Sequence, residues 1–150
     1  MASEDEREAL IAAHAREKDA EGGSSATWIL KSSAGGKGEG ITISRDVQEL
    51  INVVDAADKE TAWVVCRYLE RPMLLSGRKF DLRCWVLLDP DYGMHMYQEG
   101  VLRTSSFKYD VSDLSNQLQH LTNHCVQATA AEFGSHEDGN ELSFAGDFRV

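Results

Sequence analysis

The stretch that most constrains this chain is WILKSSAGGKGEGITI, residues 28–43, in which two short apolar runs flank a loop with four glycines. A tight hairpin needs less glycine than this, whereas a loop that brings its backbone N–H groups close to phosphate needs about this much. The loop is not a Walker A motif, because no GK[ST] follows at the required spacing. It is not a dinucleotide fingerprint either, because Ile41 stands where the last glycine would be. Two interpretations remain: a flexible surface hairpin, or a phosphate-binding loop with Lys31 on the entering strand and Lys37 at the tip.

Charge and cysteine usage narrow the class of partner. The net charge is −10, and the acidic residues concentrate near the two ends, which leaves the middle of the chain close to balanced, with five basic residues between Arg67 and Arg83. Such a chain is not expected to bind nucleic acid, whereas a locally basic centre suits an anionic ligand. Three cysteines without CxxC spacing indicate reduced thiols, and no signal peptide or membrane-length apolar run is visible. We therefore expect a cytoplasmic protein without membrane contact.

Hydrophobic periodicity predicts an α+β chain. Val47, Leu50, Ile51 and Val54 follow helical spacing, whereas the charged strand near residue 80 alternates with period two. A capping box at Ser3 starts the first predicted helix. The predicted helices are 3–20 and 44–57, with a partly helical stretch at 110–127. The predicted strands are 28–31, 40–43, a buried strand at 61–69, 78–88 and a strand with a bend at 93–106.

The strand RKFDLRCWVLL places three charged residues, Lys79, Asp81 and Arg83, on one face. A solvated ladder of ion pairs is the usual explanation of a charged strand face. However, Trp85 and Leu87 continue the same face, so we expect part of it to be covered. Charged groups beside covered surface favour a functional site.

Two further motifs carry candidate polar groups. Arg103 follows a predicted strand and precedes three hydroxyl residues. His120 and His124 have the i, i+4 spacing of helical metal ligands, but no HExxH motif or third ligand accompanies them. We therefore predict no metal ligands in this chain, and Thr122 and Asn123 between the histidines are the stronger candidates.

In this order the motifs WILKSSAGGKGEGI, YLERPMLL, GRKFDLRCWVLL, YQEGVLRTSS, HLTNHCVQ and EDGNE resemble the tubulin tyrosine ligase family over about residues 28–142. The resemblance implies a partial ATP-grasp fold. Its predicted parts are an N-terminal helix and linker (1–25), a central subdomain with the glycine-loop lid (26–72) and the start of a C-terminal sheet subdomain (73–150). The loop is most similar to that of the tyrosine-adding members, since the glutamate- and glycine-adding members usually carry a proline after the lysine.

The resemblance also implies roles for individual residues. Lys31 would hold an ATP phosphate beneath the loop, and Cys66 stands where the family commonly has glutamine. Lys79 and Asp81 would face the nucleotide, and Arg83 and Arg103 would act as catalytic residues that hold carboxylates or the reacting phosphoryl group. The complete set of implied ATP-binding residues is Lys31, Ser32, Ser33, Gly35, Gly36, Lys37, Gly38, Gly40, Cys66, Arg67, Tyr68, Leu69, Lys79, Asp81, Thr122 and Asn123.

The implied reaction is ATP-dependent ligation of free tyrosine to the C-terminal glutamate of detyrosinated α-tubulin through an acyl phosphate, with Mg²⁺ offsetting the charge of the anionic reactants. This reaction implies α-tubulin as partner and the microtubule cytoskeleton as location. Two alternatives stay open: a polyglutamylase of the same family, and a non-catalytic fragment that binds nucleotide or tubulin. The family's acidic and asparagine ligands for Mg²⁺ find no match in this chain. We therefore expect the chain alone to be inactive or nearly so, with an exposed apolar face on its sheet.

Overall fold

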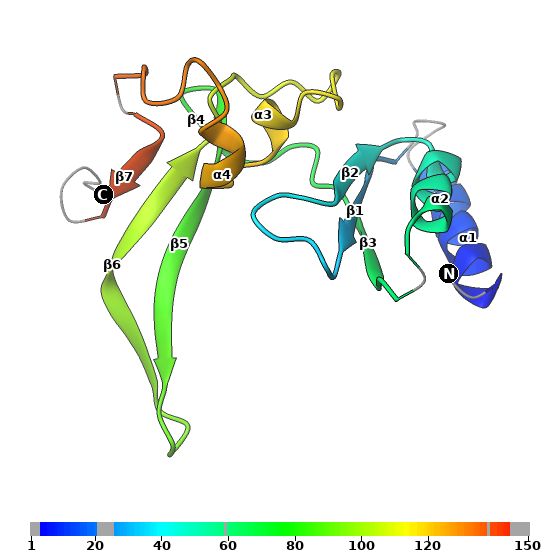
Figure 1. Ribbon diagram of the computed structural model, residues 1–150, viewed down its shortest axis with the longest axis horizontal. Coiled ribbons are helices and arrows are strands. Elements are labelled where there is room, and N and C mark those ends of the chain that lie inside the picture. The colour runs from blue at the N-terminus through cyan, green and yellow to red at the C-terminus, as the bar shows by residue number, and fades with distance from the viewer. Residues whose placement is uncertain (1–3, 21–25, 59, 138, 145–150) are drawn as a thin grey trace. The chain divides into compact units, whose positions relative to one another are not determined.

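The computed structural model describes residues 4–20, 26–58, 60–137 and 139–144. Its contacts divide the chain into two compact units, Met1–Arg71 and Pro72–Val150 (Figure 1). Each unit holds one antiparallel sheet, three-stranded in the first and four-stranded in the second. The predicted α+β class is therefore confirmed. The predicted capping box and most of the predicted linker lie outside the described residues.

The first unit combines two helices with a sheet of strand order β2-β1-β3. The glycine loop joins β1 and β2 as an antiparallel hairpin, as the sequence predicts, and the observed register pairs Lys31 with Ile41. Helix α2 begins after Asp46, whose carboxylate accepts a hydrogen bond from the Gln48 backbone N–H at 2.8 Å. The elements are α1 (Glu4–Ala20), β1 (Trp28–Ser32), β2 (Ile41–Ser44), α2 (Val47–Ala56) and β3 (Trp63–Arg67).

The core of the first unit lies between the helices and one face of this sheet. Trp28 and Leu30 of β1 pack with Leu50 and Ile51 of α2, and all four are buried. Nε1 of Trp28 also donates to Nδ1 of His14 in α1 at 3.0 Å. The helical spacing in residues 47–54 is thus explained by burial of one face of α2.

Strand β3 differs from its prediction as a buried strand. It pairs only with β1 among the described strands, so it forms an edge of the sheet. Its burial alternates, and Val64 is 56% exposed on the face away from the helices. An apolar run of this length does not reveal whether both faces of a strand are covered, because that depends on the strand order.

The second unit is built on a long β5–β6 hairpin, with sheet order β4-β5-β6-β7. Among the described strands, the second neighbours of the hairpin cover only short stretches: β4 pairs with Arg78 and Lys79, and β7 pairs with residues 101–103. The elements are β4 (Leu74–Leu75), β5 (Arg78–Leu88), β6 (Met94–Thr104), α3 (Gln117–His120), α4 (His124–Gln127) and β7 (Glu141–Ser143).

Much of the buried interior of the second unit is polar and hydrogen-bonded. Nη1 of the buried Arg78 donates to Oγ1 of Thr104 at 3.0 Å and to the Gly139 carbonyl at 3.2 Å. The side-chain amide of Asn140 donates to the Thr104 carbonyl and to Oγ of Ser106, each at 3.1 Å. Because these buried groups find partners, the loops after β6 are fixed against the sheet.

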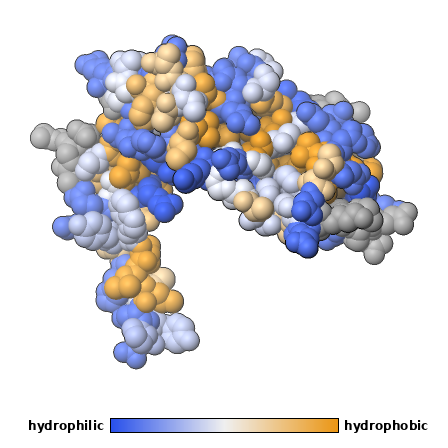
Figure 2. Space-filling view, viewed as in Figure 1, coloured by the Kyte–Doolittle hydropathy of each residue, from blue (hydrophilic) through white to orange (hydrophobic). Residues whose placement is uncertain are grey.

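Figure 2 shows exposed apolar side chains along the outer half of the β5–β6 hairpin, next to a more hydrophilic tip. Trp85 is 46% and Leu87 65% exposed, so the prediction that these residues are covered is wrong. The described strands β4 and β7 are too short to reach this half, which explains the exposure and agrees with the expected exposed apolar face. Among the described helices, none is long and apolar enough to cross a membrane.

Candidate functional site

In the first unit, Lys31 lies on the sheet face opposite to the helices. Successive side chains of a strand alternate between faces, so Lys31 is separated from Trp28 and Leu30, which pack against the helices. Pairing across the sheet places Cys66 beside Ile29 on the same face as Lys31. Lys31 is exposed and forms no ion pair with a described residue. This face therefore presents a free ammonium group next to the glycine loop.

The glycine loop is closed at its base and open at its tip. The Ser32 N–H donates to the Gly40 carbonyl at 3.0 Å, and the Ser33 N–H donates to Ala62 in the segment before β3 at 2.8 Å. A Cβ at Gly35 would lie 2.4 Å from the Glu39 carbonyl oxygen, and Gly40 has φ +67°. These two glycines are thus required by the turn itself.

The tip of the loop offers hydrogen-bond donors. The backbone N–H groups of Gly36, Lys37 and Gly38 donate to no described residue. Lys37 and Gly38 both have positive φ, at 58° and 99°. A short run of free N–H groups with lysines nearby is a suitable environment for phosphate oxygens.

The segment predicted to meet adenine is the end of β3 and the two residues after it. Tyr68 is buried, and its N–H donates to the Thr27 carbonyl at 2.9 Å. Arg67 turns to the helical side, where it forms an ion pair with Glu17 at 2.6 Å. Leu69 is 69% exposed. Of these four residues, Arg67 and Tyr68 are thus held by contacts within the first unit, whereas Cys66 and Leu69 are exposed.

In the second unit, Asp81 is the centre of a polar cluster. Arg103 lies directly opposite it on β6 and donates to its Oδ1 from Nε at 3.0 Å and from Nη2 at 2.8 Å. Oγ1 of Thr122 donates to the other carboxylate oxygen. Three residues that were singled out separately in the sequence, from three different segments, are therefore in direct contact.

The other predicted residues of this unit surround the cluster. Arg83 follows Asp81 on the same face, is exposed and forms no hydrogen bond or ion pair with a described residue. Lys79 precedes Asp81 and is partly buried. Asn123 precedes α4 and accepts there through its backbone carbonyl from Gln127 at 3.0 Å.

One residue of the cluster, Glu141, was not identified from the sequence. Glu141 of β7 lies opposite Arg103 on the side away from Asp81, and its Oε1 accepts from Nδ1 of His124 at 2.9 Å. The motif EDGNE contains Glu141, but nothing in the local pattern indicated that it pairs with β6. Asp81, Arg103 and Glu141 thus form one row across three strands.

His120 and His124 do not share a helix, contrary to the simplest interpretation of their spacing. His120 ends α3, and its Nε2 donates to the Asp113 carbonyl at 2.8 Å, whereas His124 begins α4. Burial lowers the pKa of His120, and the nearby Lys79 charge lowers it further, while the bond to Asp113 opposes the shift. Within the described residues, no group of three or more His, Cys, Asp or Glu side chains is arranged to hold a metal ion.

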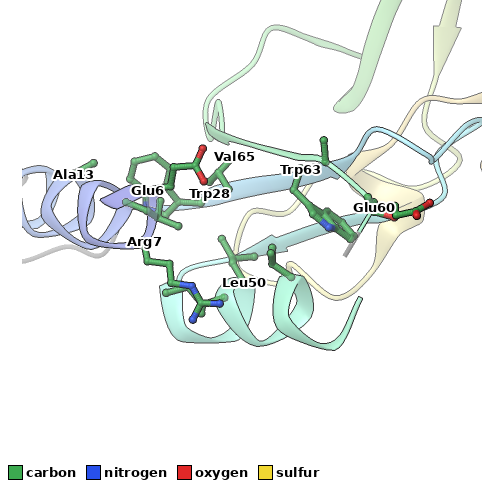
Figure 3. Close-up of a pocket in the computed structure, with 13 residues that line it drawn as sticks. Glu6, Arg7, Ala13, Trp28, Leu50, Glu60, Trp63 and Val65 are labelled. Carbon is green, nitrogen blue, oxygen red and sulfur yellow. The ribbon is translucent and has the colours of Figure 1, made fainter. Parts of the chain in front are cut away.

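A pocket of about 600 Å³ lies in the first unit, between the helices and the sheet (Figure 3). Its walls are mainly core side chains, including Trp28, Leu50 and Val65, with Arg7 at its edge. Nε1 of Trp63 is buried at this pocket without a hydrogen-bond partner among the described residues. None of the predicted site residues lines it, so the pocket is separate from the candidate site.

The comparison with known proteins agrees with this arrangement of motifs. Residues 3–145 match the family described as "Tubulin-tyrosine ligase family". The chain belongs to the tubulin-tyrosine ligase family. Its relatives include Tubulin glycylase 3D of Tetrahymena thermophila, which is 35% identical over 112 residues, covering 73% of this chain and 11% of that protein.

Two further members of the tubulin-tyrosine ligase family show the range of related activities. The probable alpha-tubulin polyglutamylase Ttll1 of Tetrahymena thermophila is 32% identical over 126 residues, or 76% of this chain and 30% of that protein. Tubulin monoglutamylase TTLL4 of Mus musculus is 35% identical over 116 residues, or 74% of this chain and 9% of that protein. The chain thus spans between 9% and 30% of the length of these three relatives.

Proposed function

We propose that this chain carries part of the nucleotide- and carboxylate-binding machinery of an ATP-dependent ligase that joins an amino acid to tubulin. The observation that carries the proposal is the contact of Asp81 with both Arg103 and Thr122. A solvated ladder of ion pairs would explain the Asp81–Arg103 pair but not Thr122, which reaches Asp81 from the segment between α3 and α4. Their convergence supports a prearranged polar site in a member of this family.

The first unit would bind the phosphates of ATP. Lys31 supplies a positive charge on the open face of the sheet, and the loop supplies the free N–H groups of Gly36, Lys37 and Gly38. Both groups suit an anion, and neither is already used by a described residue. Backbone groups of residues 66–69 would contact adenine, and for these groups the exchange of the family's glutamine for Cys66 matters little.

The second unit would hold the anionic groups that react. Arg103 uses Nε and Nη2 on Asp81, so its Nη1 remains available to a carboxylate or phosphoryl oxygen. Arg83, two residues beyond Asp81 on the same face, adds a guanidinium group that bonds to no described residue. Arginine suits this role because it stays charged and binds planar oxyanions through two parallel hydrogen bonds. ATP would supply activation of the carboxylate, while these residues hold the reacting groups and offset their repulsion.

Within the described residues, no three His, Cys, Asp or Glu side chains lie together, and Asp81 is already bonded to Arg103 and Thr122. We therefore propose no Mg²⁺ ligand among these residues.

For the transferred amino acid we propose tyrosine, on the strength of the loop sequence KSSAGGKGEGI. The second candidate is glutamate or glycine, since the relatives described above are named for glutamylation or glycylation. The proposed partner is the acidic C-terminal tail of α-tubulin, and the proposed location is the cytoplasm at microtubules.

Calorimetric titration of the chain with ATP, with and without Mg²⁺, tests the nucleotide site. We expect Lys31→Ala to weaken ATP binding about tenfold, which is the usual effect of losing one charge-assisted contact. Lys108→Ala is the matched control, because Lys108 is another exposed lysine, located after β6 in the second unit. Equal affinities of the two variants would contradict the role of Lys31, and a folded chain that binds no ATP would contradict the proposed site.

The amino acid is tested separately, by incubation with detyrosinated tubulin, ATP, Mg²⁺ and labelled tyrosine, glutamate or glycine. Incorporation of tyrosine alone would support the first candidate, and incorporation of either other amino acid would support the second. For this chain by itself we expect little or no incorporation of any of them.

A further inference from the structure

Two contacts hold the segment between α3 and α4 to the sheet on either side of Arg103. Thr122 bonds to Asp81 on β5, and His124, two residues later, bonds to Glu141 on β7. Arg103 lies on β6, the strand between them, in register with both carboxylates. The segment Thr122–His124 therefore crosses β6, which carries Arg103, and is hydrogen-bonded to β5 and β7 on either side of it.

We infer that Glu141 is a positioning residue for Arg103 and that it acts through His124. Glu141 forms no ion pair with Arg103: the guanidinium group pairs with Asp81, and Glu141 pairs with His124. Its effect instead follows a chain of contacts from Glu141 to His124, along the backbone to Thr122, and from Thr122 to Asp81. Asp81 in turn fixes Nε and Nη2 of Arg103.

The geometry around His124 suits this role. A carboxylate oxygen can only accept, so Nδ1 of His124 carries the proton in the 2.9 Å bond to Glu141. The ring also packs edge-to-face against Phe133, with centroids 5.3 Å apart and planes at 87°. The side chain of the first residue of α4 thus has two contacts, one with an acceptor and one with an aromatic ring.

A competing role for Glu141 would be purely electrostatic. It predicts the opposite change in anion affinity when the carboxylate is removed. A negative charge beside Arg103 weakens the attraction of that site for an anion, so its removal would strengthen anion binding. A positioning role predicts weaker binding after removal, since Arg103 then loses its fixed orientation. The two roles can therefore be separated by the direction of the change.

The first test measures solvent exchange of the Arg103 Nε–H by NMR in the 150-residue chain without ligand. Glu141→Ala should accelerate this exchange at least about threefold, because local opening becomes easier. Glu141→Gln should preserve the wild-type rate, since its amide oxygen still accepts from His124. Glu99→Ala is the matched control: it removes a carboxylate that contacts β7 through Ser143 at 3.3 Å but does not touch His124.

A second variant tests the same contact from its other end. His124→Phe keeps a ring against Phe133 but removes the Nδ1 donor, so it should accelerate Arg103 exchange as Glu141→Ala does. Wild-type exchange in both Glu141→Ala and His124→Phe would overturn the inference. Equal acceleration in Glu99→Ala would also overturn it, since the effect would then be a general loosening of the sheet.

The second readout rests on the proposed function and uses ATP affinity. Glu141→Ala should bind ATP severalfold more weakly than the wild type, whereas Glu141→Gln should bind at least as tightly. Tighter binding by both variants would show the electrostatic role and overturn the inference. If the wild-type chain binds no ATP, the proposed function fails, while the exchange experiment still decides the role of Glu141.

Discussion

His120 is a buried side chain in the loops of the second unit, and its protonation makes the stability of the protein depend on pH. It is 1% exposed, packs edge-on against Tyr109 and donates from Nε2 to the Asp113 carbonyl. Burial is the main cause that lowers its pKa from the ordinary value of 6.5, and the Lys79 charge contributes further. The imidazole is therefore neutral in the folded protein under conditions that protonate it in the unfolded chain.

This difference fixes the sign of a pH effect on stability. As pH falls below about 6.5, the unfolded chain takes up a proton at His120 more readily than the folded chain, so acidification favours unfolding. The stabilisation is complete above the unfolded pKa and is lost as pH falls through the folded pKa. We predict that the Tm of the wild type falls more between about pH 7.5 and 5.5 than that of His120→Gln. Parallel decreases in the two proteins would contradict this assignment.

At the scale of elements, the β5–β6 hairpin contains both buried and exposed leucines. Leu102 is 0% exposed where β6 has neighbours on both sides, whereas Leu87 is 65% exposed in the half without them. We predict that Leu102→Ala lowers the free energy of unfolding by about 2–5 kcal/mol, through lost burial and a cavity. Leu87→Ala should change it by less than about 0.5 kcal/mol. Urea titrations followed by NMR signals of β5 and β6 measure both, and similar costs would contradict the burial of Leu102.

The same elements show how far the sequence could predict the fold. Period-two alternation correctly placed Asp81 on a charged strand face, and helical spacing correctly located the buried face of α2, because both patterns are local. The contact of Asp81 with Arg103 depends on the register of a hairpin, and the exposed position of β3 depends on strand order. Neither quantity is encoded in a short window of sequence. Glu141 was missed for the same reason, since its partners are 38 and 17 residues away.

At the scale of the whole molecule, the exposed half of the hairpin is the surface that most favours association in solution. Val86 pairs with Met96 and Leu88 with Met94, and these four side chains are between 56% and 80% exposed. The outer edges of this half pair with no described strand. Contiguous apolar surface with free strand edges favours association between chains.

We therefore predict that the chain self-associates at concentrations of tens of micromolar, on the order expected for an exposed strand edge, and that Val86→Lys with Met96→Lys suppresses this. The two lysines place like charges opposite each other on the apolar hairpin. The matched control, Gln48→Lys with Asn52→Lys, adds the same charge to exposed positions of α2. Both pairs bring the net charge closer to zero from −10, a change that by itself promotes association. If only the hairpin variant has a smaller sedimentation coefficient than the wild type, the association takes place at the hairpin. A monomeric wild type, or equal sedimentation of the two variants, would contradict the prediction.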